Sequence, residues 1–332
     1  MSKATKAILQ QAERLYNAKA INENALGNST NMIFEMDTAA TPIILRVSEY
    51  SEERESHIDF ELNWLNYLSE NMAEVAKPIH SKHNRFYEII TGGSESYILC
   101  GFKKASGKLV DTNNSSEWNE DLFKRLGKIM GTIHRLSKAY EPRPDTVTQH
   151  QWNRDIFFQP QFHFNHDDEL EQIWNRITGK LHKLPKCSDA YGIIHNDLHQ
   201  LNFFIDGENI TVFDFDDCIY SWYAFDIVLT VTQGVATIPK ANEKKRNYFA
   251  QKFLSAFLQG YLSCNSLDAF WVDHFDLFFK YRRICSYKFI KHLSEKSPDN
   301  PYKEYCGGLR NEILQDKAVV SLDLVKIKSL LK

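Results

Sequence analysis

The densest group of chemically active residue types lies between residues 195 and 217. It begins with His195 and Asp197, continues to Asn202 and, twelve positions further along the chain, reaches Asp214 and Asp216. Carboxylate and amide oxygens are the ligands that Mg²⁺ prefers in proteins, and this ion also bridges phosphate groups. These residue types therefore indicate a site for a hard cation, suited to phosphate chemistry.

A β-hairpin is predicted to hold part of this group. Asp206-Gly207 separates two apolar runs, which is typical of a tight turn between antiparallel strands. If the turn is centred between positions 207 and 208, Ile205 faces Ile210 and Asn202 faces Phe213. Residues just outside these strands are then brought together at the open end of the hairpin.

That open end is where Asn202 and Asp214 are expected, with Asp197 on the loop that leads into it. The plainest alternative is that Asp and Asn mark loops, as they do in most sequences. A second alternative is a transition-metal site built from His195, Asp197 and His199. No HExxH motif or distant Cys/His set completes such a site, so Mg²⁺ is the favoured ion.

Composition excludes several other classes of function. The fourteen glycines include no pair that fits the dinucleotide, Walker or nucleophile-elbow motifs, so any phosphate site must be built in another way. Forty basic and 43 acidic residues give a net charge of −3, which disfavours binding to nucleic acid or to an anionic membrane. The six cysteines form no CxxC pair, and no signal core or long apolar stretch is present. We therefore expect a soluble cytoplasmic protein with reduced thiols, while its oligomeric state is not predicted.

The string HNDLHQLN followed by DFDD resembles the signature of the aminoglycoside phosphotransferase/choline kinase-like family, especially members similar to homoserine kinase and stress-response kinases. The resemblance implies a protein-kinase-like fold and transfer of the γ-phosphate of ATP to a hydroxyl, with Mg²⁺. Asp197 would orient and deprotonate the acceptor hydroxyl. Asn202 and Asp214 would hold Mg²⁺, with Asp216 giving further metal or structural help.

The same likeness assigns supporting roles in the catalytic loop. His195 would brace the loop through hydrogen bonds, and Asp226 would anchor it from a following helix.

An N-terminal strand and helix are expected to add a buried ion pair. On the helix that begins near Glu52, Glu61 falls within an apolar stripe, where a carboxylate is costly unless it is paired. Alternation along the strand from Ile43 to Ser48 makes Arg46 its candidate partner. By the resemblance, Arg46 takes the place of the kinase lysine that contacts the α- and β-phosphates.

The remaining nucleotide contacts are also implied by the resemblance. The phosphate loop carries only Gly27, so its backbone N–H groups and the side chains of Asn28, Ser29 and Thr30 would cover the phosphates. The segment Leu99–Lys104, which includes Phe102, resembles the hinge that holds adenine.

The overall prediction is an α+β, two-lobed, protein-kinase-like fold. A small N-terminal lobe of sheet and helix spans residues 1–101, and a larger, mainly helical catalytic and acceptor-binding lobe spans 102–332. The aromatic residues of 245–295 are interpreted mostly as core, with the alternative that some line the acceptor pocket beside Asp197. Asp268, Asp273 and Asp276 are interpreted as a solvated helix face, with the alternative that they attract a cationic substrate such as an aminoglycoside.

The acceptor is predicted only as a small molecule: an amino alcohol, amino acid, sugar or aminoglycoside. Two other functions are less favoured. A pseudokinase is disfavoured because Asp197, Asn202 and Asp214 are all intact. A Ser/Thr protein kinase is disfavoured because no A-P-E segment follows Asp214.

Overall fold

The computed structural model describes residues 3–22, 25, 27–28, 31–92, 95–142, 150–164, 167–296 and 303–331. The chain divides into two compact units. The first comprises residues 1–109 and 202–216, and the second comprises 110–201 and 217–332. The hairpin predicted at 203–213 thus groups with the N-terminal residues, and the lobe boundary at residue 101 stays a prediction.

The first unit is built on a seven-stranded antiparallel sheet, in the order β1-β3-β4-β7-β5, with β2 beside β3 and β6 beside β7. Its elements are α1 (Lys3–Tyr16), β1 (Ala18–Ala20), β2 (Gly27–Asn28), β3 (Met32–Thr38), β4 (Ile43–Glu49), α2 (Glu52–Asn71), β5 (Pro78–Ile79), β6 (Tyr87–Gly92), β7 (Glu95–Lys103) and β8 (Lys108–Leu109). The helix predicted from Glu52 and the strand predicted from Ile43 are both present.

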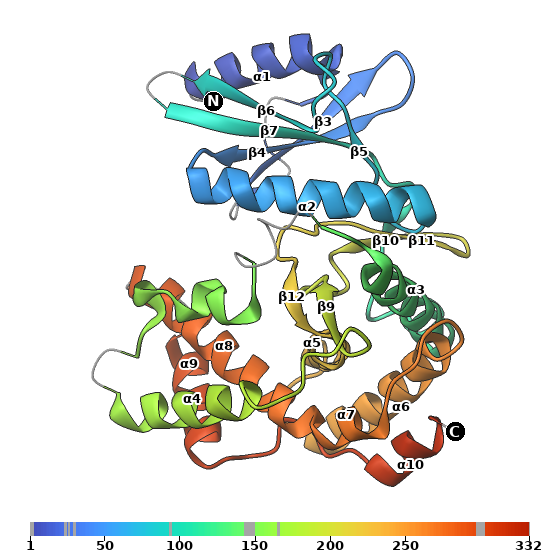
Figure 1. Cartoon of the computed structure of the whole chain (residues 1–332), viewed down its shortest axis with the longest axis vertical. Helices are drawn as coiled ribbons and strands as arrows, with labels where there is room; N and C mark the ends of the chain where they lie inside the picture. Colours follow the sequence, from blue (N-terminus) through green and yellow to red (C-terminus); the bar gives the residue numbers. More distant parts are fainter. Residues whose placement is uncertain are drawn as a thin grey trace. The chain divides into compact units, whose positions relative to one another are not determined.

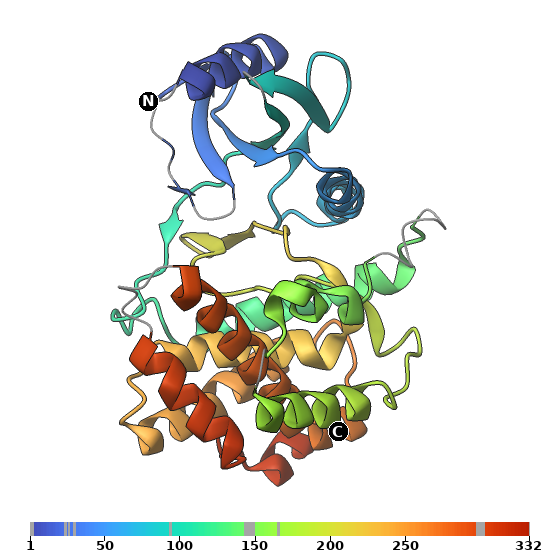
Figure 2. The same cartoon turned by 90° about the vertical axis from the view of Figure 1, so that its left-hand side faces the viewer.

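Two helices cover opposite faces of this sheet (Figures 1 and 2). In β7, Tyr97 and Leu99 belong to the apolar core beneath α1, while Ile98 and Cys100 belong to a separate cluster with α2 residues. This division follows from the alternation of side chains along a strand. Strand residues on the α2 side therefore lie on the face where Glu61 is buried.

The predicted hairpin is formed by β10 (Phe203–Asp206) and β11 (Asn209–Val212). Ile205 pairs with Ile210, which confirms the predicted register. Gly207 has a φ of 58°, a left-handed turn conformation that glycine adopts without steric cost. Strand β8 adds a third strand beside β10.

The second unit is mainly helical. Its elements are α3 (Glu120–Ala139), the 3₁₀ turns η1 (Trp152–Arg154), η2 (Ile156–Phe158) and η3 (Pro160–Phe162), α4 (Asp168–Leu181), β9 (Tyr191–Ile194), β12 (Ile219–Trp222), α5 (Tyr223–Ala236), α6 (Glu243–Tyr261), α7 (Ala269–Asp273), α8 (Phe275–Lys296), α9 (Lys303–Leu314) and α10 (Leu324–Ser329). Helices α3 and α6 lie side by side (Figure 1). Their close approach depends on the missing side chain of Gly127, because a Cβ at that position would lie 1.9 Å from the Phe257 carbonyl oxygen.

One expectation for this unit is confirmed, and one strand pairing was not predicted. The aromatic residues of 245–295 are mostly buried, as predicted, whereas Tyr248, Phe270 and Phe289 are exposed at 65%, 42% and 45%. Strand β12 begins at Ile219 and pairs with β9, a pairing that the sequence did not indicate. Strands β9 and β12 are far apart in the sequence, and their pairing cannot be read from local periodicity.

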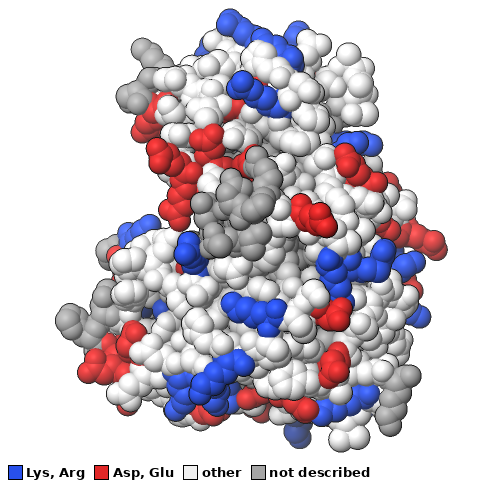
Figure 3. All heavy atoms as spheres, in the orientation of Figure 1, with Lys and Arg blue, Asp and Glu red and all other residues white. Residues whose placement is uncertain are grey.

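The surface carries both signs of charge. On the face drawn in Figure 3, basic and acidic side chains are interspersed, and neither sign covers it. Among the described residues, no helix is long and apolar enough to cross a membrane.

Candidate active site

The first unit contains the predicted ion pair between Arg46 and Glu61. Both residues are buried, with exposures of 3% and 0%. Arg46 Nη1 donates to Glu61 Oε1 at 2.9 Å, and Arg46 Nη2 donates to Glu61 Oε2. Burial alone would lower the pKa of Arg46, but the carboxylates of Glu61 and Asp216 hold that pKa well above its usual value. The pairing is confirmed, and a role in phosphate binding stays a prediction.

The expected hinge needs a correction. Residues 99–103 lie inside β7, which pairs with β4 along one edge and with β5 and β6 along the other. The Lys103 N–H donates to the Lys77 carbonyl at 2.8 Å, so this backbone is used within the sheet and is not a linker. The Phe102 ring lies 5.2 Å from the Arg46 guanidinium carbon, and its contact with adenine stays a prediction.

The expected phosphate loop is described only in part. Gly27 and Asn28 form the short strand β2, where they pair with Ile33 and Met32. Ser29 and Thr30 lie outside the described residues. Phosphate contacts by this segment stay a prediction.

The hairpin brings the two predicted Mg²⁺ ligands to the same end. The Phe213 N–H donates to the Asn202 carbonyl at 2.9 Å, so Asp214 directly follows the residue opposite Asn202. Asn202 is buried, and Asp214 has a φ of 63°, which is uncommon for a residue with a Cβ and concentrates at functional sites. The backbone placement agrees with the prediction.

The donor chemistry at this end fits a hard cation, because an amide and a carboxylate supply oxygen ligands. Among the described residues, no group of three or more His, Cys, Asp or Glu side chains is arranged to hold a metal ion. Metal binding by Asn202 and Asp214 stays a prediction.

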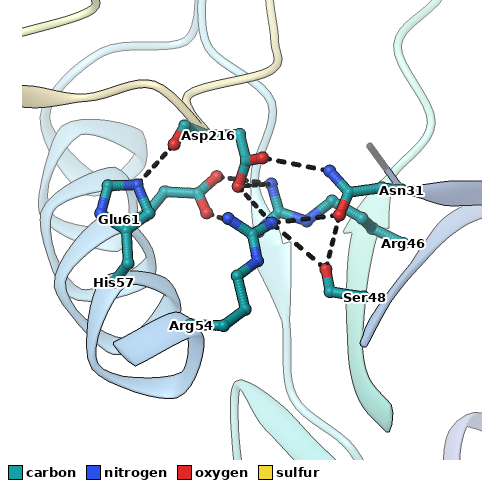
Figure 4. Close-up of polar contacts among 7 residues, drawn as sticks. All are labelled: Asn31, Arg46, Ser48, Arg54, His57, Glu61 and Asp216. Atoms are coloured by element: carbon teal, nitrogen blue, oxygen red, sulfur yellow. Dashed lines mark hydrogen bonds and ion pairs between the residues drawn. The ribbon is translucent and has the colours of Figure 1, made fainter. Parts of the chain in front are cut away.

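Asp216 lies in a network of polar contacts with residues of α2, β4 and the segment before β3 (Figure 4). Burial would raise the pKa of Asp216, but the neighbouring Arg46 and Arg54 hold it well below its usual range. Arg54 and Asn31 were not anticipated from the sequence, because nothing local marks them as partners of Asp216. Metal binding by Asp216 stays a prediction.

In the second unit, Asp226 anchors the loop that carries Asp197. Asp226 is fully buried in the first turn of α5. Its carboxylate accepts the backbone N–H groups of His195 at 3.0 Å and Asn196 at 2.9 Å, and also accepts from His134 Nε2 at 3.0 Å. This confirms the anchoring role predicted for Asp226.

His195 is buried and contacts the loop as expected. Its Nδ1 accepts the Asp197 N–H at 3.3 Å. This contact fixes the start of the loop and agrees with the bracing role implied by the resemblance. A direct part for His195 in catalysis stays a prediction.

Three side chains from different elements surround the Asp197 carboxylate. His199 Nε2 lies 3.1 Å from Oδ2, Gln233 Nε2 donates to Oδ1 at 3.4 Å, and Arg282 Nη2 lies 3.8 Å from Oδ1. Burial would raise the pKa of Asp197, but His199 and Arg282 hold it below its usual value. Sequence reasoning missed Gln233 and Arg282, which lie on α5 and α8, far along the chain.

Comparison with known proteins gives concordant matches. The sequence model of the phosphotransferase enzyme family APH matches residues 21–267. Amicoumacin kinase of Bacillus subtilis (strain 168) is 28% identical over 319 residues, covering 95% of this chain and 94% of that protein.

Solved structures agree with the sequence matches. The structure of amicoumacin kinase hAmiN in complex with AMP-PNP, Ca²⁺ and Ami aligns with a TM-score of 0.84 and 26% identity, over 97% of this chain and 96% of the other. A microcompartment-associated aminopropanol kinase shares the fold, with a TM-score of 0.69 and 21% identity over 93% and 94% of the two chains.

These matches confirm the predicted kinase-like α+β fold. They also confirm the predicted activity, in which ATP and Mg²⁺ are used to phosphorylate a hydroxyl group of a small molecule. Because the family model spans well over half of the sequence, the chain belongs to the phosphotransferase enzyme family APH.

Proposed function

We propose that the acceptor of this enzyme is amicoumacin or a compound of its class. The observation that carries the proposal is the similarity to amicoumacin kinase, which extends over nearly the whole of both chains. A match over nearly the full length covers the predicted acceptor-binding residues of 102–332 as well as the catalytic motif, so it supports a shared acceptor better than a match of the motif alone.

We assign the chemical step to Asp197. Its lowered pKa keeps the carboxylate ionised near neutral pH, ready to accept a hydrogen bond from the acceptor hydroxyl and then its proton. Phosphoryl transfer depends mainly on positioning and charge neutralisation, so a weakly basic carboxylate is sufficient. His199, Gln233 and Arg282 would hold Asp197 in one orientation.

The nucleotide contacts follow from the first unit. Arg46 offers a guanidinium fork suited to phosphate oxygens, Asn202 and Asp214 would hold Mg²⁺, and Phe102 would contact the base. Mg²⁺ would neutralise charge on the phosphates. Gly27, Asn28 and Ser29 would cover the phosphates. For this role we expect the enzyme in the cytoplasm, where ATP is available, with no nucleic-acid partner.

The test is a phosphorylation assay with ATP, Mg²⁺ and amicoumacin, beside choline, 1-aminopropan-2-ol and homoserine, read by the mass of the product. Asp197→Asn is expected to lower kcat about 10²- to 10⁴-fold, the usual contribution of general base catalysis. Nucleotide affinity, measured with a fluorescent ATP analogue, should stay unchanged.

Asp189→Asn is the matched control, because that carboxylate is 88% exposed in the same unit, and its kcat should equal that of the wild type. Phosphorylation of another acceptor but not of amicoumacin would reject amicoumacin as the acceptor. The role of Asp197 would then be tested by the same kcat measurement with the other acceptor. Near-normal kcat in Asp197→Asn would reject that role.

A further inference from the structure

We propose that Arg54 is a positioning residue for the metal-binding end of the hairpin, and that Asp216 serves as its charge partner and not as a metal ligand. Arg54 lies in the first turns of α2, and Asp216 follows the hairpin (Figure 4). The proposal rests on the proposed binding of Mg²⁺ by Asn202 and Asp214.

Both oxygens of the Asp216 carboxylate are engaged. Oδ1 accepts from Arg54 Nη2 at 2.6 Å and lies 3.3 Å from Arg46 Nη1, while Oδ2 accepts from Asn31 Nδ2 at 3.1 Å. A carboxylate neutralised by two guanidinium groups has little charge left to attract a dication, and the guanidinium groups would repel one. Asp216 is therefore poorly suited to ligate Mg²⁺ in this arrangement.

The backbone beside Asp216 is fixed to the same helix. His57 Nε2 donates to the Asp216 carbonyl oxygen at 2.5 Å. The buried rings of Phe215 and Trp64 pack edge to face, with centroids 5.5 Å apart. Two consecutive residues are thus held by α2, and Asp214 immediately precedes them.

Arg54 is itself oriented by polar neighbours. Its Nη2 also donates to Asn31 Oδ1 at 3.1 Å and to Ser48 Oγ at 3.2 Å, and the Ser48 hydroxyl donates to Asn31 Oδ1 at 2.7 Å. The Arg54 side chain is only 20% exposed. Because the pair of Arg54 and Asp216 is fixed and partly desolvated, it holds Asp216 in place better than a solvated surface pair, whose partners move freely.

Replacement of Arg54 should therefore make the position of Asp214 less fixed and weaken metal binding, although no metal ligand is replaced. Groups that orient metal ligands typically contribute 10- to 100-fold to metal affinity. Without Arg54, Arg46 would be the remaining guanidinium partner of Asp216, beside the amide of Asn31, and Asp216 would draw Arg46 away from nucleotide phosphates.

The experiment measures Mn²⁺ binding by electron paramagnetic resonance, with AMP-PNP present and no turnover. Arg54→Ala is expected to weaken Mn²⁺ binding 10- to 100-fold, with partial recovery in Arg54→Lys. Asp216→Asn should weaken it to a similar degree, and the double variant should lose no more than either single variant, because both changes break one interaction. Arg310→Ala is the control: it breaks an arginine fork to Asp167 in the second unit and should leave Mn²⁺ affinity unchanged.

Three results would overturn or redirect the proposal. Mn²⁺ affinity within twofold of the wild type in both Arg54 variants would reject the positioning role. Additive losses in the double variant would show that Asp216 acts on the metal without Arg54. Unchanged Mn²⁺ affinity in Asn202→Ala would reject the proposed metal site itself, which distinguishes failure of that assignment from failure of this one.

Discussion

Replacement of Asp226 by alanine should destabilise the second unit strongly and abolish turnover. The carboxylate has no solvent exposure, and it accepts hydrogen bonds from two consecutive loop N–H groups and from His134. His134 is also fully buried, and burial lowers its pKa, so at neutral pH it is a neutral donor to Asp226. Alanine would leave three donors without their acceptor, of which the His195 N–H and His134 Nε2 are buried.

The expected magnitude follows from these contacts. A hydrogen bond to a charged group contributes about 1.5–3 kcal/mol, and a buried donor left without an acceptor costs about 1–3 kcal/mol. Because three donors lose their acceptor together, we expect Asp226→Ala to lower the free energy of unfolding by about 3–5 kcal/mol. Asp226→Asn keeps the size and one acceptor oxygen, so about half of that loss is expected.

Urea unfolding followed by tryptophan fluorescence would measure the loss, and kcat would be measured on the folded fraction. Asp189→Ala is the control: its carboxylate is 88% exposed, and a change within about 0.5 kcal/mol is expected. A loss below about 1 kcal/mol in Asp226→Ala would refute the reasoning. So would full activity, since His195 and Asn196 would then need no anchor.

Two further predictions concern packing and pH. Gly127→Ala should destabilise the protein by about 1–3 kcal/mol, because the added Cβ clashes with α6. Gly179→Ala should stabilise it by about 0.5–1 kcal/mol, because Gly179 lies in α4 with open space around it. Equal effects of the two substitutions in thermal unfolding would contradict this prediction. Burial raises the pKa of Asp155 to about 6, so the folded state holds this proton more tightly, and the free energy of unfolding falls as pH rises from about 4 to 6. Asp155→Asn should therefore gain stability relative to the wild type as pH rises over that range. A difference in the free energy of unfolding that does not change with pH would show that the pKa of Asp155 is not raised.

The features that could be predicted from the sequence depend on short-range pattern. The register of β10 and β11 follows from one Asp-Gly turn and the two-residue period of a strand. The pairing of Arg46 with Glu61 follows because an apolar helix stripe that contains a carboxylate requires a cation from the strand it covers. Both rules need only a few neighbouring residues.

What could not be predicted depends on contacts between distant segments. Arg54 is one of several charged residues in the first turns of α2, and nothing near it in the sequence distinguishes it from a solvated surface residue. Arg282 contacts Asp197 only because α8 packs on α5. The predicted hinge segment is a strand for a similar reason: β4 pairs with β7 as far as Lys103, and β5 pairs with Gly101 and Phe102 on the other edge. The two-residue strand β5 has no periodicity to detect.

The network also gives a physical reason for arginine at position 46, where the resemblance to kinases implies a lysine. Arg46 engages both oxygens of Glu61 through two nitrogens, and its Nη1 also lies 3.3 Å from Asp216. An ammonium group is a point charge that cannot form this fork. With Arg54, the cluster contains two cations and two carboxylates, so its charges balance in a site where an uncompensated charge would be costly. The arginine and the second cation on α2 are therefore parts of one arrangement: Asp216 requires Arg54 because Arg46 is already shared with Glu61.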